Sequence, residues 1–155
     1  DRGSFAGLRP EEIQRLSWED YLQYDDYFLI NTEVSKTSRM RKIPKNECLK
    51  DWMDKLSKGT LREGKIVTIS NVTKNRYVQA LKEKFGGPMK SKAQGRDLFR
   101  HCYVSYRCAD TDWNFQTVAN ETGHSVQQLK SSYLKLVGKR ESKEWFSTFP
   151  DKAHK

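Results

Sequence analysis

Apolar positions recur along the chain at helical spacing, which predicts a series of short helices. Pro10 is favoured at the first position of a helix, and the residues from there to Leu16 continue one with acidic residues in its first turn. From Cys48 to Leu56 the apolar residues lie three and four apart, and Gly59 ends that run. Further helices are expected at 72–85, from Asp97 onward, around Phe115–Ala119, from Ser125 onward and at 141–149.

The later helices carry signals at their ends. Asp97 is a candidate N-cap, Gly123 is a suitable C-terminal stop, and Ser125 with Gln128 fits a capping box. The apolar face of the helix after Asp97 is expected to hold the following residues: Leu98, Cys102, Tyr106 and Ala109.

Segments rich in aromatic and β-branched residues predict three short antiparallel strands with a turn near residues 35–37. They are Trp18–Tyr21, Tyr27–Thr32 and Arg39–Pro44. We therefore expect an α+β fold that is mainly helical, with helices packed around a small three-stranded antiparallel sheet.

Length and charge narrow the class of protein. The chain has 155 residues, enough for one domain with a core, and a formal net charge of +9, which favours an anionic partner such as nucleic acid. A membrane surface would also attract this charge. The sequence has no apolar stretch of membrane-spanning length and no secretory signal at its start, so we expect a cytoplasmic location.

Candidate ligands for metals and cofactors are scarce. The three cysteines, Cys48, Cys102 and Cys108, include no CxxC pair, which disfavours a disulfide framework or a zinc site and predicts buried thiols. The chain also has no GxxxxGK[ST] loop and no cluster of carboxylates suited to magnesium. We expect no cofactor and no metal.

Considered singly, the candidate functional residues have ordinary structural interpretations. Tyr133 lies on an apolar stripe at helical spacing, which is typical of a core residue. Arg9 and Arg100 fit solvated surface charges, and His124 follows a helix-ending glycine, where it could bond the last carbonyls. The basic run around the predicted hairpin fits a strand edge protected from aggregation: Lys36, Arg39, Arg41, Lys42 and Lys45.

Four segments in order nevertheless resemble the motifs of the tyrosine recombinase (phage integrase) family. GLRPEEIQRLSWED resembles the first arginine motif, and SKTSRMRKIP resembles the hairpin with the catalytic lysine. DLFRHCYVSY resembles the box with the second arginine, and GHSVQQLKSSYLKLV resembles the glycine–histidine segment followed by the nucleophilic tyrosine. The resemblance runs from Gly7 to Pro150 and implies the catalytic-domain fold of that family.

The resemblance implies a role for each matching residue. Arg9 and Arg100 would hold the scissile phosphate, Lys36 would be the general acid, His124 would donate a hydrogen bond to a phosphate oxygen, and Tyr133 would attack. The supporting residues would be Glu12, Asp97 and His101. The residues expected to contact DNA are Arg39, Arg41, Lys42, Lys90, Lys92 and Arg96, of which the last three lie in a basic, glycine-containing loop predicted at 86–96.

The chemistry explains the residue types. Guanidinium groups stay charged at working pH and offer paired donors to the charge that builds on a phosphate during attack. A phenol, with an ordinary pKa of about 10, needs nearby positive charge or a base to become a nucleophile. A lysine can protonate the leaving 5′ oxygen. The resulting 3′-phosphotyrosine keeps the bond energy, so neither ATP nor a metal is required.

Two departures from the family pattern stand out. Asp97 occupies the position where the family usually has histidine, and His101 does not replace it by simple geometry, because adjacent helix residues point about 100° apart. Only eight residues precede Arg9. We therefore expect residues 1–155 to be an N-terminally truncated catalytic domain without the family's separate DNA-binding domain.

Three functions remain open at this point. The first is site-specific recombination of double-stranded DNA in a prokaryote or phage, by a chain that is monomeric alone and tetrameric on paired sites. The second is a type IB topoisomerase, and the third is a non-catalytic DNA-binding module derived from an integrase. Trp145, Phe146 and Phe149 would either pass to a neighbouring protomer or fold back on their own core.

Overall fold

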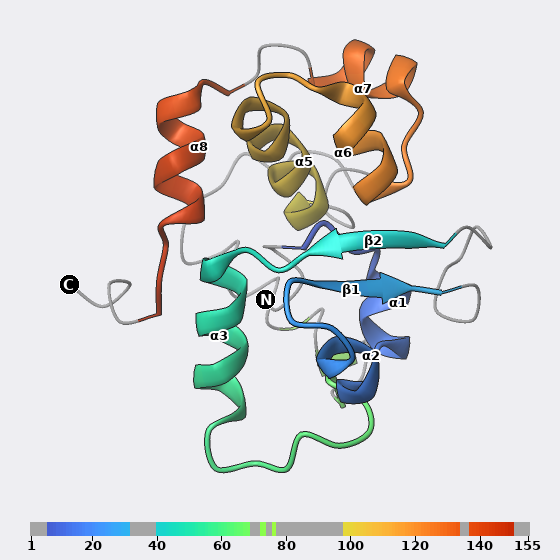
Figure 1. Cartoon of the computed structure of the whole chain (residues 1–155), viewed down its shortest axis with the longest axis vertical. Helices are drawn as coiled ribbons and strands as arrows, with labels where there is room; N and C mark the ends of the chain where they lie inside the picture. Colours follow the sequence, from blue (N-terminus) through green and yellow to red (C-terminus); the bar gives the residue numbers. More distant parts are fainter. Residues whose placement is uncertain are drawn as a thin grey trace.

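The computed structural model describes residues 6–31, 40–68, 72–73, 76, 98–133 and 137–150, in which a two-stranded antiparallel sheet separates two groups of helices (Figure 1). One group comprises α1 (Pro10–Arg15), α2 (Trp18–Leu22) and α3 (Glu47–Ser57). The other comprises α5 (Leu98–Asp110), α6 (Phe115–Thr122), α7 (Val126–Tyr133) and α8 (Lys139–Phe146). The mainly helical α+β character is confirmed.

The sheet pairs β1 (Tyr27–Ile30) with β2 (Arg41–Pro44). Phe28 lies opposite Ile43 and Ile30 lies opposite Arg41, and residues directly opposite share one face of a sheet. All four are buried, so Arg41 belongs to the apolar face of the sheet although it is charged.

The strand predicted at Trp18–Tyr21 is wrong. Residues 18–21 belong to α2, because Ser17 caps this helix: the Asp20 backbone N–H donates to Ser17 Oγ (3.1 Å) and the Ser17 N–H donates to Asp20 Oδ2 (3.1 Å). These bonds satisfy donors that a helix leaves open at its start. Trp18 and Tyr21, three residues apart, then bury their rings on the same side of the helix.

The predicted helices that fall within the described residues are present, with small shifts at their ends. Gly123 ends α6 in the left-handed conformation (φ +70°), and the Gln128 N–H donates to Ser125 Oγ at the start of α7 (3.1 Å). The helix expected at 72–85 lies almost wholly outside the described residues, as do the loop at 86–96 and Asp97.

The buried face of α5 agrees with the predicted one only in part, since Ala109 is fully buried as expected. Tyr103, Val104 and Cys108 are fully buried, whereas Cys102 and Tyr106 are half-buried. A helix that contacts α6, α7 and α8 must bury more than one narrow stripe, and the helical period alone does not indicate which side meets which neighbour.

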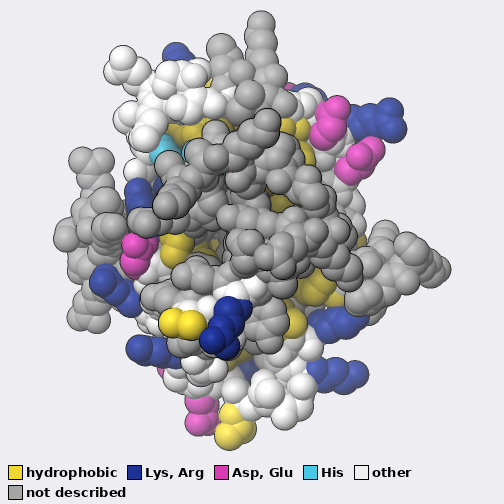
Figure 2. All heavy atoms as spheres, turned by 180° about the vertical axis from the view of Figure 1, so that it is seen from behind, with side chains coloured by type: hydrophobic (Ala, Val, Ile, Leu, Met, Phe, Trp, Pro, Cys, Tyr) yellow, Lys and Arg dark blue, Asp and Glu magenta, His cyan; other side chains and the backbone are white. Residues whose placement is uncertain are grey.

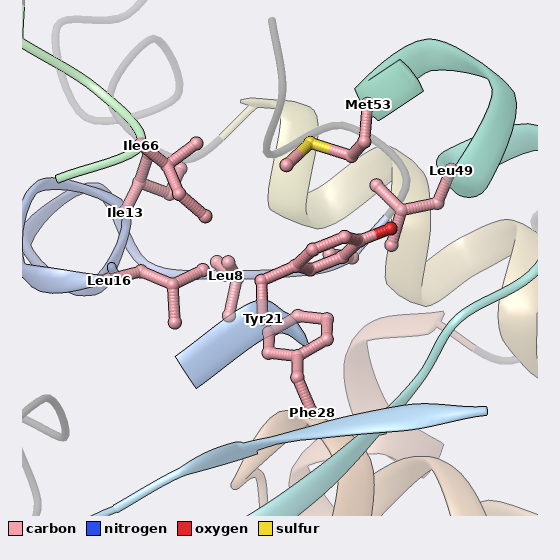
Figure 3. A pocket seen from close by; sticks show the side chains of 9 residues that line it. Leu8, Ile13, Leu16, Tyr21, Phe28, Leu49, Met53 and Ile66 are labelled. Atoms are coloured by element: carbon pink, nitrogen blue, oxygen red, sulfur yellow. The ribbon is translucent and has the colours of Figure 1, made fainter. Parts of the chain in front are cut away.

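The core consists of two clusters, one on each side of the sheet. The first joins α1, α2, α3 and the sheet and encloses a small apolar cavity between side chains such as Leu16, Tyr21 and Met53 (Figure 3). The second joins α5, α6 and α7 and includes Leu129 and Tyr133. The cavity has no charged lining residue, so we regard it as a packing gap.

The aromatic residues near the end of the chain pack on their own protomer. Trp145 of α8 stacks on Tyr106 of α5, with ring centroids 4.5 Å apart. The segment after α8 descends to α3 (Figure 1), where Trp52 Nε1 donates to the Thr148 carbonyl (2.7 Å). Of the two alternatives for this segment, the fold-back arrangement is the one in the isolated chain. In the described residues we find no helix long and apolar enough to cross a membrane.

Candidate functional site

Arg9 and Glu12 are placed by the start of α1. Arg9 is the N-cap residue, and its backbone N–H donates to Glu12 Oε2 (2.8 Å) while its Nη1 donates to Glu12 Oε1 (3.1 Å). The Glu12 residue is fully buried (0% exposed), whereas the Arg9 side chain retains 20% exposure. The Arg9 side chain at the start of α1 is thus partly exposed, and the buried Glu12 carboxylate holds it by a hydrogen bond.

Arg41 reaches the same carboxylate from β2. Its Nη2 donates to Glu12 Oε2 (2.5 Å), and its Nε donates to the Glu121 carbonyl at the end of α6 (3.0 Å). Burial raises the pKa of Glu12, but the hydrogen bond and charge of Arg41, followed by those of Arg9, outweigh it and lower that pKa below its ordinary value. Glu12 is therefore ionised at neutral pH.

The expectation that Arg41 lies on the DNA-contacting surface does not fit its burial. Arg41 is 5% exposed, and its Nη1 is a buried donor without a hydrogen-bond partner among the described residues. Lys42, the next residue, is exposed and lies over the Tyr27 ring, with Nζ 4.7 Å from the centroid. The alternation of a strand gave a signal for this difference, since Arg41 shares its face with the apolar Ile43.

Arg100 is buried and held by backbone oxygens. It is 5% exposed, its Nη1 donates to the Gly7 carbonyl (2.5 Å), and its Nη2 donates to the Thr122 carbonyl. Within the described part of the chain it forms no ion pair with a carboxylate. Burial, and after it the charges of Arg9 and Arg41, lower the pKa of Arg100 to about 10, so the group is still a cation at neutral pH.

Gly7 makes the approach of Arg100 feasible. It adopts φ +62°, a conformation that suits glycine, and a Cβ at this position would lie 2.3 Å from Cδ1 of Tyr103. The absence of a side chain lets the segment before α1 lie flat on α5. The Gly7 carbonyl then meets the guanidinium of Arg100.

His124 follows Gly123 and turns back toward Arg100. Its Nδ1 lies 2.9 Å from Thr122 Oγ1 and 3.4 Å from Arg100 Nη2. The Thr122 hydroxyl donates its proton to the Val118 carbonyl (2.6 Å), so Nδ1 donates to Thr122 Oγ1 in one tautomer and accepts from Arg100 in the other. Burial, followed by the charges of Arg100 and Arg9, lowers the pKa of His124 to about 3, so the ring is neutral at neutral pH.

Tyr133 is both a core residue and a member of this cluster. It is 3% exposed, and its ring packs with Leu129 in the second hydrophobic cluster. Its hydroxyl lies 2.6 Å from Nδ1 of His101, and its ring meets the His124 ring edge-on at 5.8 Å. The ring is therefore fixed by apolar packing while the hydroxyl meets polar groups.

The structure thus brings together five of the residues singled out in the sequence: Arg9, Glu12, Arg100, His124 and Tyr133. His101 joins them through Tyr133, and Arg41 joins them through Glu12. They come from α1, β2, α5, the α6–α7 connection and α7, at the junction between the two helical groups. Of the remaining candidates, Lys42 lies on the exposed side of β2, and the others lie outside the described residues: Lys36, Arg39, Lys90, Lys92, Arg96 and Asp97.

Among the described residues, positive charge exceeds negative charge at this junction. Three guanidinium groups, those of Arg9, Arg41 and Arg100, act on one another, and one carboxylate, Glu12, offsets them. The Nη1 atoms of Arg9 and Arg41 converge beside Gly123, each 3.7 Å from the position of a Cβ built there. Such an arrangement can receive an anion of about the charge of a phosphate diester.

The outer surface is less distinctive than the junction. On the face seen in Figure 2, the lysine and arginine side chains of the described residues are spread around the margins with acidic ones among them. The described residues contain no group of three or more His, Cys, Asp and Glu side chains suited to a metal ion.

Comparison with known proteins gives a match of fold. No protein-family model and no curated protein sequence matches the chain. Three solved structures of the Tn1549 transposon integrase do. One, a variant with an arginine replaced by lysine in complex with a circular intermediate DNA, has a TM-score of 0.59 and 19% identity, and the match covers 92% of this chain and 56% of that one.

The other two structures agree with the first. A second complex with circular intermediate DNA gives a TM-score of 0.55 at 17% identity over 94% of this chain and 58% of that one. A complex with transposon right-end DNA, of a variant with a tyrosine replaced by phenylalanine, gives 0.56 at 16% over 93% and 55%. The chain spans little more than half of each matched integrase chain, and the likeness shows a shared fold.

Proposed function

We propose that this chain is the catalytic region of a DNA strand-transferase of the tyrosine recombinase type, which breaks and rejoins DNA through a covalent 3′-phosphotyrosine. The observation that carries the proposal is the buried excess of positive charge that the described residues form at the junction, where Arg100 and Tyr133 act on each other electrostatically. Burying cations without matching carboxylates is costly, and a bound phosphate diester would offset that cost.

In this proposal the arginines bind and polarise the scissile phosphate. Arg9, the more exposed of the two, meets one nonbridging oxygen, and Arg100 supports the other from inside. Their donors act where charge grows as the phosphorus becomes five-coordinate, which stabilises the transition state more than the ground state. Glu12 is a positioning residue that holds Arg9 and Arg41, and Arg41 also binds the end of α6.

His124 contributes a hydrogen bond and no charge. With a pKa of about 3 it stays neutral at working pH, and in the tautomer that carries the proton on Nε2 this proton is available to a phosphate oxygen. This distinguishes it from the arginines, whose contribution is electrostatic. A substitution that keeps an N–H donor, such as His124→Asn, would retain more activity than His124→Ala.

Tyr133 is the proposed nucleophile. Its oxygen attacks phosphorus, the bond to the 5′ oxygen breaks, and the chain is joined to the 3′ phosphate. Lys36, on the predicted hairpin, would protonate the leaving oxygen. A second 5′ hydroxyl then attacks the phosphotyrosine and restores the diester, so each step exchanges one ester bond for another.

DNA is the proposed partner, with contacts from exposed basic side chains around the junction. Lys42 lies on the exposed side of β2, and the predicted basic segments carry the remaining candidates: Arg39, Lys90, Lys92 and Arg96. The Tn1549 integrase structures contain DNA, which is consistent with this partner. We further propose a monomer in isolation and a tetramer on paired DNA sites.

The test is a search for the covalent adduct. The full-length protein is incubated with a pool of nicked duplexes of random core sequence, in which the short strand diffuses away after cleavage and traps the intermediate. Adducts that survive denaturation are recovered, the DNA is sequenced, and the modified peptide is identified by mass spectrometry. A phosphotyrosyl peptide containing Tyr133 supports the proposal.

Other outcomes identify the rival functions. DNA binding without an adduct indicates a non-catalytic DNA-binding module. An adduct from a monomer that relaxes supercoiled DNA without crossover products indicates a type IB topoisomerase. Crossover products from paired sites indicate recombination.

A further inference from the structure

The hydroxyl of Tyr133 is in hydrogen-bond contact with a histidine on a different helix. Oη of Tyr133, at the end of α7, lies 2.6 Å from Nδ1 of His101, near the start of α5. The two rings are stacked, with centroids 5.4 Å apart and planes inclined by 29°. The contact is therefore fixed in both distance and orientation.

The contact joins the phenolic oxygen to a ring nitrogen. A neutral phenol has one proton to donate, and a neutral imidazole accepts it at the nitrogen that carries none. In the tautomer with the ring proton on Nε2, Nδ1 of His101 accepts from the Tyr133 hydroxyl. His101 is exposed, so a proton received at Nδ1 can exchange with solvent.

The other groups of the cluster are unsuited to this task. His124 has a pKa of about 3, and its Nδ1 is directed at Thr122 and Arg100. The guanidinium of Arg100 is a cation with no lone pair to accept a proton. Among the described titratable groups around Tyr133, His101 combines contact with the hydroxyl and access to solvent.

We infer that His101 is the proton acceptor for Tyr133, and hence a catalytic residue of the proposed reaction. The O–H bond of Tyr133 breaks and an N–H bond forms at Nδ1 as Oη bonds to phosphorus. The electron pair of the broken P–O bond goes to the 5′ oxygen, which takes a proton from Lys36. In the rejoining step the attacking 5′ hydroxyl gives its proton to Lys36, and the imidazolium returns a proton to the departing phenolate oxygen, so atoms and charge balance.

This inference rests on the proposed function, and it places the base and a phosphate-binding arginine on the same helix, α5. The base would follow Arg100 directly, on the helix that also carries this arginine. Adjacent side chains diverge, and here the divergence is useful: Arg100 is buried toward Gly7 and Thr122, while His101 turns to the end of α7. One helix thereby supplies the phosphate-binding cation and the base at separate positions.

The experiment measures adduct formation by the full-length protein with His101→Ala and His101→Gln, using the nicked substrate selected for the wild type. Gln retains an oxygen that accepts the phenolic hydrogen bond, yet it cannot take the proton. We expect both variants to be slower by about 100-fold or more, the usual scale for a general base. We also expect added imidazole to restore part of the rate of His101→Ala.

Two outcomes would overturn the inference: His101→Gln within a few-fold of the wild type, or His101→Ala without any recovery in imidazole. Either would reduce His101 to a residue that positions the tyrosine ring. Ser132→Ala, an exposed neighbour of Tyr133 on α7, is the control and should match the wild type. Thermal unfolding and DNA binding of each variant report whether its fold is intact.

A sulfur substitution separates the two proton transfers. When the 5′ leaving oxygen of the substrate is replaced by sulfur, the leaving group needs no proton, so an acid becomes dispensable while a base does not. The loss in His101→Gln should persist on this substrate, and its disappearance would assign His101 as an acid. Failure of the proposed function is separate: the wild type would then form no adduct, or Tyr133→Phe would still form it.

Discussion

Arg41 is paired with Glu12 through a 2.5 Å contact between Nη2 and Oε2, with side-chain exposures of 3% and 0%. The pair ties β2 to the start of α1 and, through the Glu121 carbonyl, to the end of α6. It therefore connects β2 with α1, whose N-cap is Arg9, and with α6, which ends two residues before His124. A buried ion pair of this kind fixes geometry more surely than it adds stability.

Removing one partner of this pair should be strongly destabilising. Arg41→Met leaves the Glu12 carboxylate buried beside Arg9 alone, and we expect the free energy of unfolding to fall by about 3–5 kcal/mol. Glu12→Gln in the same background should recover part of this loss, because it removes the orphaned charge. Urea unfolding of the two single variants and the double variant forms the cycle. Strictly additive losses would contradict the coupling.

Local patterns predicted most helices, and they failed where two local signals competed. Residues 18–21 are rich in aromatic side chains, which favours a strand, but Ser17 and Asp20 form a capping box, and the helix that it starts prevails. On β2 the period of two would have placed Arg41 inside. Its positive charge, taken alone, favoured the surface.

The contacts that assemble the site could not be predicted from local sequence. Arg41 and Glu12 are 29 residues apart, and Arg100 lies 93 residues from the Gly7 carbonyl that it binds. No spacing rule spans such distances. The residues of the site are therefore predicted only by the resemblance of four segments to the tyrosine recombinase motifs. The contact between His101 and Tyr133 likewise depends on how α5 and α7 cross.

Stability should respond to acid through His124. The unfolded histidine takes up a proton near its ordinary pKa of 6.5, whereas the folded one resists until about 3. Between these values the unfolded state binds more protons, so the free energy of unfolding falls with falling pH, by at most about 1.4 kcal/mol per pH unit. Urea unfolding at intervals from about pH 7 down to about pH 5 measures this slope.

The matched variant for this effect is His124→Gln. It should show a smaller slope in that window, where Glu12, whose pKa is lowered below 4.5, remains ionised in both proteins. Equal slopes in the two proteins would mean that His124 titrates normally in the folded state.

DNA affinity should depend on the lysines of the predicted loop at 86–96. The double substitution Lys90→Ala with Lys92→Ala should weaken binding to all sequences alike, because phosphate contacts carry no base information. The slope of log affinity against log salt should become shallower by about one per lost contact. Binding is measured by fluorescence anisotropy at several salt concentrations. The control, Lys139→Ala, removes an exposed lysine on α8 that is paired with Asp112.

Arg100 should matter for catalysis more than for binding. Arg100→Lys keeps the charge but loses the planar fork that meets the Gly7 and Thr122 carbonyls and the proposed phosphate. We expect the rate of adduct formation to fall by about 100- to 1,000-fold, the scale for removing one donor to a developing oxyanion. Arg140→Ala, whose side chain is 89% exposed, is the control. Equal rates in Arg100→Lys and the wild type would remove Arg100 from the mechanism.

Tyr133→Phe separates the catalytic role of this residue from its packing role. The ring lies in the second hydrophobic cluster and Phe retains it, so we expect the melting temperature to change little. The hydroxyl, with its 2.6 Å contact to His101, is what the change removes. If Tyr133 is only a core residue, the variant stays active; if it is the nucleophile, the adduct is lost while DNA binding persists. Quantifying adducts on denaturing gels beside anisotropy on the same DNA decides between the two, and adduct formation by Tyr133→Phe would exclude it as the nucleophile.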